Sequence, residues 1–292
     1  MKRFRWLVAG TAGAAMALAA LAGSTAASAA QLAPAARAAS HPSLRMTNQP
    51  AIHLPGHGAK PGGITVDHSS NWSGYVDTPK SGSSFKAVSA SYTVPSANCA
   101  KTGSSINAFA YHWIGIDGWS DGTVEQDGVA DFCEHGTASY DAWHEMYPAP
   151  FTTAFAVSPG DAITSSVTYT ASTKTYVLKL TDVTSGQSFS VSAKCAADTT
   201  CSNSSAEVIT EGYQSLPTWT GTADFGQENY VAADVTDAAG TTGSLSDTSA
   251  WNDLESVAYG AVSNQPMTQP GQLYQGLSSS QSAFDVVWQR VD

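Results

Sequence analysis

Basic residues are scarce in this sequence, which has 13 Lys and Arg against 24 Asp and Glu and a formal net charge of −11. Nucleic-acid binding needs a basic surface to neutralise phosphates, so this composition argues against nucleic acid as a partner. Every acidic residue lies in 67–292, where only seven basic residues accompany them. A surface this acidic repels itself at neutral pH and is relieved when its carboxylates protonate. We therefore predict a protein better suited to acid than to neutral conditions.

Histidines and free thiols, which nucleophilic catalysis would need, are also rare in this sequence. Four of the seven histidines lie at or before His68, and the sequence around His112 and His144 predicts strands rather than a catalytic triad. No DTG or DSG tripeptide occurs, which argues against the paired aspartates of aspartic peptidases. No CxxC pair occurs either, so we predict no metal site and no cofactor. Carboxylates remain as the candidate catalytic groups.

Four cysteines are present, and in an exported chain they most often form two disulfides, for which three connectivities exist. Cys195 and Cys201 flank the short AADTT loop and would close it locally. Cys99 and Cys133 would then form the second bridge. With all four cysteines paired, none is available as a nucleophile.

The first residues form an export signal rather than a membrane span. A basic start is followed by an Ala/Leu-rich run to about Gly23, and Ala27–Ala29 supplies small residues for cleavage. The run is short and rich in alanine for a membrane span, and its character is that of a bacterial signal. We predict that residues 1–29 are removed, and that the mature protein is secreted to the extracellular space without membrane attachment.

Residues 30–67 carry Pro, Gly, His and Ser in place of strand alternation. Such composition is typical of a pro-segment or linker with little structure of its own. No acidic residue precedes Asp67, so this stretch is opposite in charge to the domain that follows. It could lie across an acidic cleft and leave when carboxylates protonate, or it could be a plain basic linker.

Short alternating runs such as SASYTV, TYVLKLT and FDVVWQRV dominate residues 68–292, and helical periodicity is nearly absent. Turn-forming residues punctuate these runs, as in TSGQ at 184–187. A chain of this length can build one sandwich or barrel with a substantial core. We predict an all-β, largely antiparallel domain.

Three consecutive predicted strands from Tyr111 to Pro148 carry an unusual mixture of side chains. Alternate residues of a strand share a face, which groups Asp141, Trp143 and Glu145 in SYDAWHEMY. The same rule groups Trp113 with Asp117, and places Gln126 between Val124 and Gly128 on its own strand. A buried core does not need carboxylates and a carboxamide, because each must find a partner or cost free energy. This pattern favours a functional face, and a solvated sheet face is the alternative.

A second acidic strand lies at AEVITEGY, where alternation places Glu207, Ile209, Glu211 and Tyr213 on one face. A glutamate near its usual pKa of about 4.3 is partly ionised in mild acid and can act as a general base on water. A carboxamide opposite it can donate a hydrogen bond to a developing oxyanion. These residue types together suit acyl-transfer chemistry.

Six motifs recur in the order of one known family: SSNWSGYV (69–76), ASYTVP (90–95), WIGIDG (113–118), EQDGV (125–129), SYDAWHEMYP (139–148) and AEVITE (206–211). In these, the chain resembles the glutamic peptidases (the G1 family, or eqolisins), as a homologue of bacterial type. The resemblance implies an antiparallel β-sandwich of two curved sheets, a jelly roll like that of concanavalin A and other lectins. It also implies an acid-acting endopeptidase without a metal, which binds protein or peptide substrates, and we expect it to act as a monomer.

The resemblance carries roles to individual positions. Gln126 and Glu211 match the catalytic Gln/Glu dyad. The matching residues expected to orient the dyad or line the substrate cleft are Trp72, Trp113, Asp117, Asp141, Trp143 and Glu145. Two departures stand beside them: Val208 replaces an aromatic residue, and Asp127 replaces a small polar residue, where an added carboxylate could raise the pKa of Glu211 if it were close.

Two other functions fit the same residues. A non-enzymatic sandwich lined with Trp, Tyr and acids would suit carbohydrate, because aromatic rings stack on sugars. A glycoside hydrolase would use Glu211 with Asp141 or Glu145 as its two carboxylates.

Overall fold

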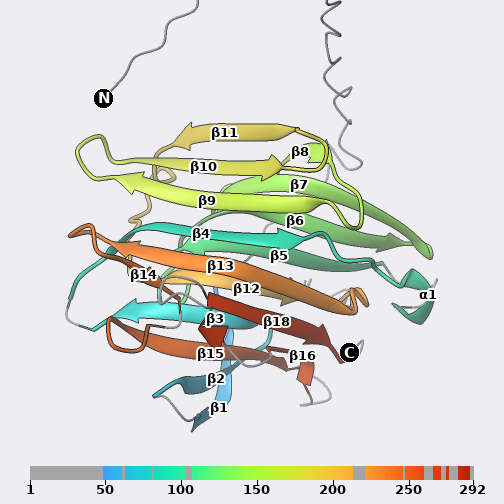
Figure 1. Cartoon of the computed structure of the whole chain (residues 1–292), viewed down its shortest axis with the longest axis horizontal. Coiled ribbons are helices and arrows are strands. Elements are labelled where there is room, and N and C mark those ends of the chain that lie inside the picture. The colour runs from blue at the N-terminus through green and yellow to red at the C-terminus, as the bar shows by residue number, and fades with distance from the viewer. Residues whose placement is uncertain are drawn as a thin grey trace, which may run out of the picture. The chain divides into compact units, whose positions relative to one another are not determined.

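Two β-sheets pack face to face in this protein, and Figure 1 shows their strands in two layers. The computed structural model describes residues 49–60, 63–80, 82–102, 107–212, 221–245, 247–259, 266–270, 274–275 and 282–289, all within one compact unit, Pro34–Asp292. The predicted export signal (1–29), residues 30–48 of the predicted pro-segment and Tyr213 lie outside these described residues. Within them the longest helix is α1 (Cys99–Thr102), and no helix has the length and apolar character needed to cross a membrane.

The first sheet contains most of the motifs. Its strands, in spatial order, are β8 (Thr152–Ala156), β7 (Thr137–Tyr147), β6 (Val124–Glu134), β5 (Ala108–Ile116), β12 (Ala206–Gly212), β3 (Trp72–Pro79), β15 (Trp251–Tyr259), β2 (Thr65–Ser69) and β1 (His53–Ala59). Neighbouring strands are antiparallel except for β2, which runs parallel to β15. The strand β12 enters between β3 and β5, so residues far apart in the sequence become neighbours.

The second sheet covers one face of the first. Its strands, in spatial order, are β11 (Ser188–Ala193), β10 (Thr175–Asp182), β9 (Ala162–Thr170), β4 (Phe85–Thr93), β13 (Gln227–Asp237) and β18 (Ser282–Trp288). Three short strands complete it: β14 (Thr242–Ser244), β16 (Pro266–Pro270) and β17 (Tyr274–Gln275). Because β16 pairs with both β15 and β18, it joins the two sheets at one edge. The predicted antiparallel β-sandwich is confirmed.

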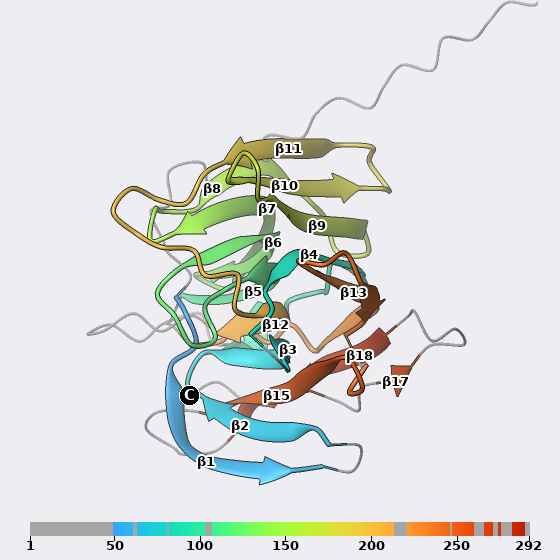
Figure 2. The ribbon, with the colours of Figure 1, turned by 90° about the vertical axis from the view of Figure 1, so that its left-hand side faces the viewer.

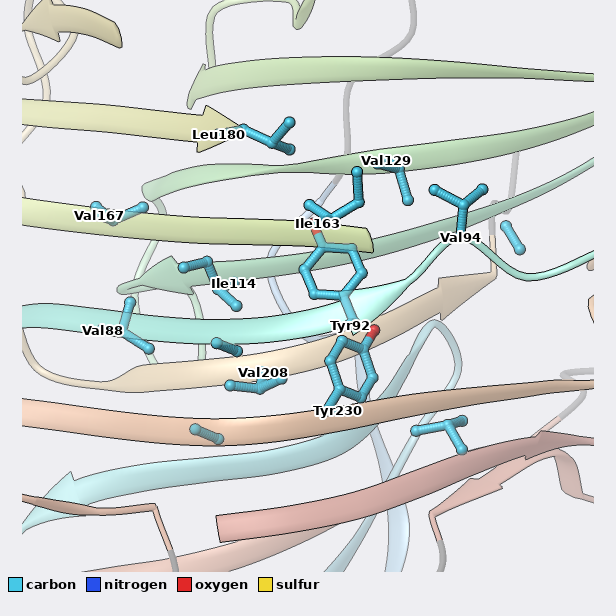
Figure 3. Packing of buried hydrophobic residues seen from close by; sticks show 14 of the residues in the cluster. Val88, Tyr92, Val94, Ile114, Val129, Ile163, Val167, Leu180, Val208 and Tyr230 are labelled. Atoms are coloured by element: carbon cyan, nitrogen blue, oxygen red, sulfur yellow. The ribbon is translucent and has the colours of Figure 1, made fainter. Parts of the chain in front are cut away.

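The hydrophobic core lies between the sheets, as Figure 3 shows. Alternation turns one face of each strand inward. Ile114 and Val208 come from the first sheet, whereas Val88, Val167 and Tyr230 come from the second, and all five are buried. The alternating apolar residues predicted from the sequence therefore form one continuous inter-sheet core.

The opposite face of the first sheet, which we call the outer face, carries a second apolar cluster. Its buried members are Trp72, Val76, Phe109, Tyr111, Trp113, Trp119, Val124, Ala130, Phe132, Trp143, Phe151 and Ile209. Strands β5 and β12 are consequently buried on both faces along their whole length. A sheet face that only met solvent would not hold so many enclosed aromatic rings.

The stretch before residue 68 is more ordered than its composition predicts. Strands β1 and β2 form a hairpin that joins the sheet edge beside β15, as Figure 2 shows. Lys60 anchors this hairpin through an ion pair of 2.5 Å with the buried carboxylate of Glu255. The prediction of little structure in 30–67 is thus wrong for its described residues, because backbone pairing with β15 supplies the order that their own composition does not.

Both predicted disulfides are confirmed. Cys99 bonds Cys133, and Cys195 bonds Cys201. The first ties α1 to the end of β6, and the second closes a loop that leads toward β12.

Candidate active site

The strand register brings the predicted site residues onto the outer face. In β6 and β7, Gln126 lies directly opposite Glu145. In β12 and β3, Glu211 lies directly opposite Trp72. Directly paired residues point to the same side of a sheet, so strand alternation predicted this grouping correctly.

Glu211 is buried, and neutral groups donate hydrogen bonds to both of its oxygens. Trp113 Nε1 donates to Oε2 at 3.1 Å, and Asn71 Nδ2 donates to Oε1 at 3.1 Å. The backbone N–H of Gln49 also donates to Oε1, at 3.3 Å. Burial raises the pKa of Glu211 to about 8, and the hydrogen bonds from Asn71, Gln49 and Trp113 oppose that rise.

Gln126 is fully buried, and its amide is fixed at one end only. Its Nε2 donates to Glu145 Oε2 at 2.9 Å. Its Oε1 is buried without a hydrogen-bond partner among the described residues. A primary amide nitrogen carries two N–H groups, so the contact with Glu145 leaves the second available to another acceptor.

Trp113 lies between these two side chains. Glu211 is aligned with Tyr111 of β5, and Gln126 is aligned with Gly115 of the same strand. Glu211 and Gln126 are therefore placed diagonally, offset by about 13 Å along the strand direction. Trp113 is the residue midway along that offset. A Cβ on Gly115 would come within 2.9 Å of the Trp113 ring and 3.3 Å of the Gln126 side chain. The absence of a Cβ at residue 115 therefore leaves room for the Trp113 indole beside Gln126.

Asp117 and Asp141, also predicted near the dyad, are placed differently. Asp117 follows β5 with a φ of 72° and accepts hydrogen bonds from the backbone N–H groups of Asn203 and Ser204 at 2.8 and 2.6 Å. It thereby fixes the loop that leads into β12. Asp141 is buried on the outer face, on the same strand as Glu145.

Asp127, the substitution beside Gln126, does not belong to the site. Its neighbours in register are Ile114 and His144, which point toward the second sheet. Asp127 is fully buried on that side, and burial raises its own pKa well above the usual range. The predicted influence of Asp127 on the pKa of Glu211 is therefore not supported.

An extended segment, Gln49–Ile52, lies against Glu211 and was not predicted as part of the site. Trp72 Nε1 donates to the Gln49 carbonyl at 2.9 Å. The backbone N–H of Ala51 donates to the Gly118 carbonyl at 3.0 Å. This segment helps to close the site, where Glu211 is only 3% exposed.

Asn71 belongs to the candidate site by its contacts and was not predicted from the sequence. It stands beside Trp72 in the motif SSNWSGYV, so strand alternation would point it to the opposite face. Asn71 precedes the first residue of β3, however, and its side chain reaches Glu211 and Gln49–Ile52. Its position inside a motif next to a candidate site residue was the only available signal.

Against known proteins, a family model described as the peptidase A4 family matches residues 70–266, more than half of the chain. The chain belongs to the peptidase A4 family. Aspergillopepsin-2 from Aspergillus niger is 31% identical over 201 residues, which cover 62% of this chain and 70% of that protein. Scytalidopepsin B from Scytalidium lignicola is 36% identical over 148 residues, or 50% of this chain and 52% of that protein.

The fold agrees with a solved peptidase structure. The crystal structure of scytalido-glutamic peptidase with a transition state analog inhibitor has a TM-score of 0.60 and 27% identity, and covers 75% of this chain and 98% of that chain. As a peptidase A4 family member, this protein is a glutamic-type endopeptidase, a hydrolase of peptide bonds. Membership disfavours both the carbohydrate-binding sandwich and the glycoside hydrolase.

Other chemistries receive no support in this peptidase A4 domain. Gly118–Gly122 reads GWSDG, a GxSxG spacing, but it joins strand β5 to strand β6, whereas a nucleophile elbow joins a strand to a helix. Glu125 lies near Cys195 and Cys201 at a spacing that could hold a metal ion. Those two sulfurs form a disulfide, and a disulfide sulfur is not a thiolate ligand.

Proposed function

We propose that this peptidase is a secreted, monomeric, acid-acting enzyme that activates water with Glu211 and Gln126. One observation carries the proposal: a carboxyl group on the outer face contacts the backbone N–H of an extended chain segment, Gln49–Ile52. A catalytic acid must reach a peptide nitrogen in this way. The two disulfides suit an oxidising, extracellular compartment.

Glu211 has two successive roles in this mechanism. As a carboxylate it takes a proton from a water molecule, which attacks the carbonyl carbon of the scissile bond. The protonated Glu211 then gives that proton to the departing nitrogen. Oxygens that already accept hydrogen bonds from Trp113 and Asn71 are held in fixed directions, which keeps the acid oriented for both transfers.

Gln126 stabilises the charge that develops on the carbonyl oxygen. The contact with Glu145 fixes the amide plane and turns the nitrogen, rather than the oxygen, toward a defined position. The second N–H of Gln126 then donates to the tetrahedral oxyanion. Because an amide does not titrate, only Glu211 changes protonation state, and no shared proton between two carboxyls is needed.

The part of the chain that precedes β2, which includes Gln49–Ile52 and β1, keeps the enzyme latent. Gln49–Ile52 occupies the place of a substrate, and the burial it helps to create holds the pKa of Glu211 at about 8, so that the acid stays protonated and cannot act as a base in mild acid. Departure of the segment admits water, lowers the pKa of Glu211 and opens the cleft together. Until then the ion pair of Lys60 with Glu255 anchors the hairpin to β15, and the contact of His53 with Asp67, at 3.4 Å, joins β1 to β2 within it.

The proposal is tested by digesting a denatured protein at about pH 4, near the usual pKa of glutamate. We expect cleavage that persists with pepstatin and with a chelator. Gln126→Ala should lower kcat/KM by about 10²- to 10³-fold, because the oxyanion loses a donor. The exposed Gln227→Ala is the matched control and should retain full activity. Full activity in Gln126→Ala, or inhibition by pepstatin, would exclude the proposed mechanism.

A further inference from the structure

The segment Gln49–Ile52 shows how the outer face holds an extended polypeptide, and the inference drawn from it rests on the proposed roles of Glu211 and Gln126. A general acid must stand within hydrogen-bond reach of the nitrogen that departs. The nitrogen in that place is the backbone N of Gln49, 3.3 Å from Glu211 Oε1. Gln49 therefore stands in for the substrate residue whose amine is released, and Pro50, Ala51 and Ile52 stand in for the residues that follow it.

Asn71 makes more contacts with this segment than any other described side chain. Its Nδ2 lies 3.3 Å from the Gln49 carbonyl oxygen and 3.2 Å from the Pro50 carbonyl oxygen. Its Oδ1 accepts from the Ile52 backbone N–H at 2.9 Å. The same Nδ2 also donates to Glu211, at 3.1 Å. One amide thus connects the segment's backbone with the candidate catalytic acid.

Two neighbours complete this arrangement. Trp72 Nε1 donates to the Gln49 carbonyl at 2.9 Å, so that carbonyl has two side-chain donors. Ser69 Oγ donates to Asn71 Oδ1 at 2.8 Å and accepts from the Asn71 backbone N–H at 3.2 Å. Asn71 is therefore held in one orientation by its own turn, independently of the segment.

We propose that Asn71 and Trp72 bind the substrate backbone on the leaving-group side of the scissile bond, and that Asn71 also positions Glu211 beneath the departing nitrogen. Every contact of Asn71 with the segment is to backbone atoms. Asn71 and Trp72, which we call the clamp, should consequently accept extended peptides irrespective of the side chains at these positions.

The clamp makes a specific statement about proline in substrates. The second residue after the cut corresponds to Pro50, whose backbone nitrogen carries no N–H and whose carbonyl alone is used. The third corresponds to Ala51, whose N–H donates to the Gly118 carbonyl at 3.0 Å. Proline should therefore be accepted at the second position after the cut and penalised at the third.

A set of otherwise identical peptides, with proline moved through the positions after the cut, tests this on the wild-type enzyme. We expect kcat/KM to stay within about 3-fold of the parent peptide with proline in the second position. It should fall by about 3- to 10-fold in the third, the effect of one lost hydrogen bond. The reverse order would overturn the assigned path of the chain.

Substitution of Asn71 tests its positioning role. Asn71→Ala should lower kcat/KM by about 10- to 100-fold, because one group serves both substrate and acid. It should also move the acid limb of the kcat/KM–pH profile to higher pH, since a hydrogen bond that favours ionised Glu211 is lost. Trp72→Phe keeps the ring but removes the donor to the carbonyl. It should raise KM and move that limb less than Asn71→Ala does, because the Trp72 hydrogen bond lowers the pKa of Glu211 less than the Asn71 hydrogen bond does.

Asn252→Ala is the control, because Asn252 is exposed on the neighbouring strand and donates only at the rim, to the Pro79 carbonyl at 3.3 Å. It should leave both kcat/KM and the limb unchanged. A purely structural Asn71 would lower activity without moving the limb, which would refute the positioning role. An active Asn71→Ala beside an inactive Glu211→Gln would refute this inference alone, whereas an active Glu211→Gln would refute the proposed function itself. The proline series still decides the clamp if Asn71→Ala does not fold.

Discussion

Glu207 and Glu211 lie four residues apart on the same face of β12, yet their surroundings differ. Glu211 receives hydrogen bonds from Trp113, Asn71 and the backbone of Gln49. Both oxygens of Glu207 are buried without a hydrogen-bond partner among the described residues. Burial, followed by the charge of Asp117, holds the pKa of Glu207 well above its usual range.

The difference shows what makes a buried carboxyl group usable. Burial disfavours the charged form of both glutamates. Several neutral donors oppose this effect at Glu211, whereas at Glu207 only the nearby Ser205 hydroxyl does so. Register alone would favour Glu207 as the partner of Gln126, because both residues align with Gly115 on β5. Directional donors, rather than alignment with Gln126, therefore identify Glu211 as the better candidate for a group that ionises during turnover.

A pair of aspartates provides a third environment for buried carboxyl groups. Asp77 and Asp253 lie directly opposite each other on β3 and β15, and both are buried. Burial and the neighbouring Asp253 carboxyl raise the pKa of Asp77 well above its usual range, and burial raises that of Asp253 to about 7. A carboxyl pair of this kind is tolerated when protonated, so it links the fold itself to acid pH.

The sharpest test of the comparison exchanges each glutamate for its neutral isostere. Glu211→Gln should lower kcat/KM by at least about 10³-fold, because the general base and acid are lost together. Glu207→Gln should remain within about 5-fold of the wild type. Steady-state cleavage of one peptide under identical conditions measures both. Inactivity of Glu207→Gln with an active Glu211→Gln would reverse the assignment and pair Glu207 with Gln126.

The carboxyl pair is tested by stability rather than by rate. With its pKa raised in the folded state, Asp77 binds more protons folded than unfolded, so stability falls as pH rises from its usual value of 3.8 toward the raised value. Asp77→Asn should remove that fall, which amounts to about 1.4 kcal/mol per pH unit for one group.

Thermal unfolding at about pH 4 and pH 7 measures this effect, because the loss of stability begins near the usual pKa of 3.8 and grows as pH rises. We expect Asp77→Asn to raise Tm at the higher pH and to leave it almost unchanged at the lower. Asp198→Asn removes one exposed negative charge and serves as the control. An equal change at both pH values in Asp77→Asn would show that the pair does not couple folding to acid.

The smallest expected effect concerns a single donor to Glu211. Trp113→Phe removes the hydrogen bond from Nε1 but keeps a ring over Gly115. The pKa of Glu211 should rise, and kcat/KM on the acid side should fall by about 3- to 10-fold, the usual effect of one hydrogen bond. The pH dependence of kcat/KM is the measurement. An unmoved acid limb would mean that Trp113 only fills space.

The residues alone determined more of this protein than its fold class. Strand alternation predicted that Gln126 and Glu145 lie on the same face of the sheet. The register confirms that they pair directly. The short spacing of Cys195 and Cys201 favoured the pairing that the structure contains. These predictions succeeded because each depends on local geometry: the period of a strand, or the closure of a short loop.

Tertiary structure decided which distant groups meet. Trp113 and Glu211 are 98 residues apart, and Asn71 and Glu211 are 140 apart, and they touch because β12 inserts between β3 and β5. Alternation fixes the face of a residue but not its register against a strand from elsewhere in the chain. The period of a strand also ends where the strand ends, so it could not place Asn71, nor the segment Gln49–Ile52 that is held by backbone contacts rather than by its own composition.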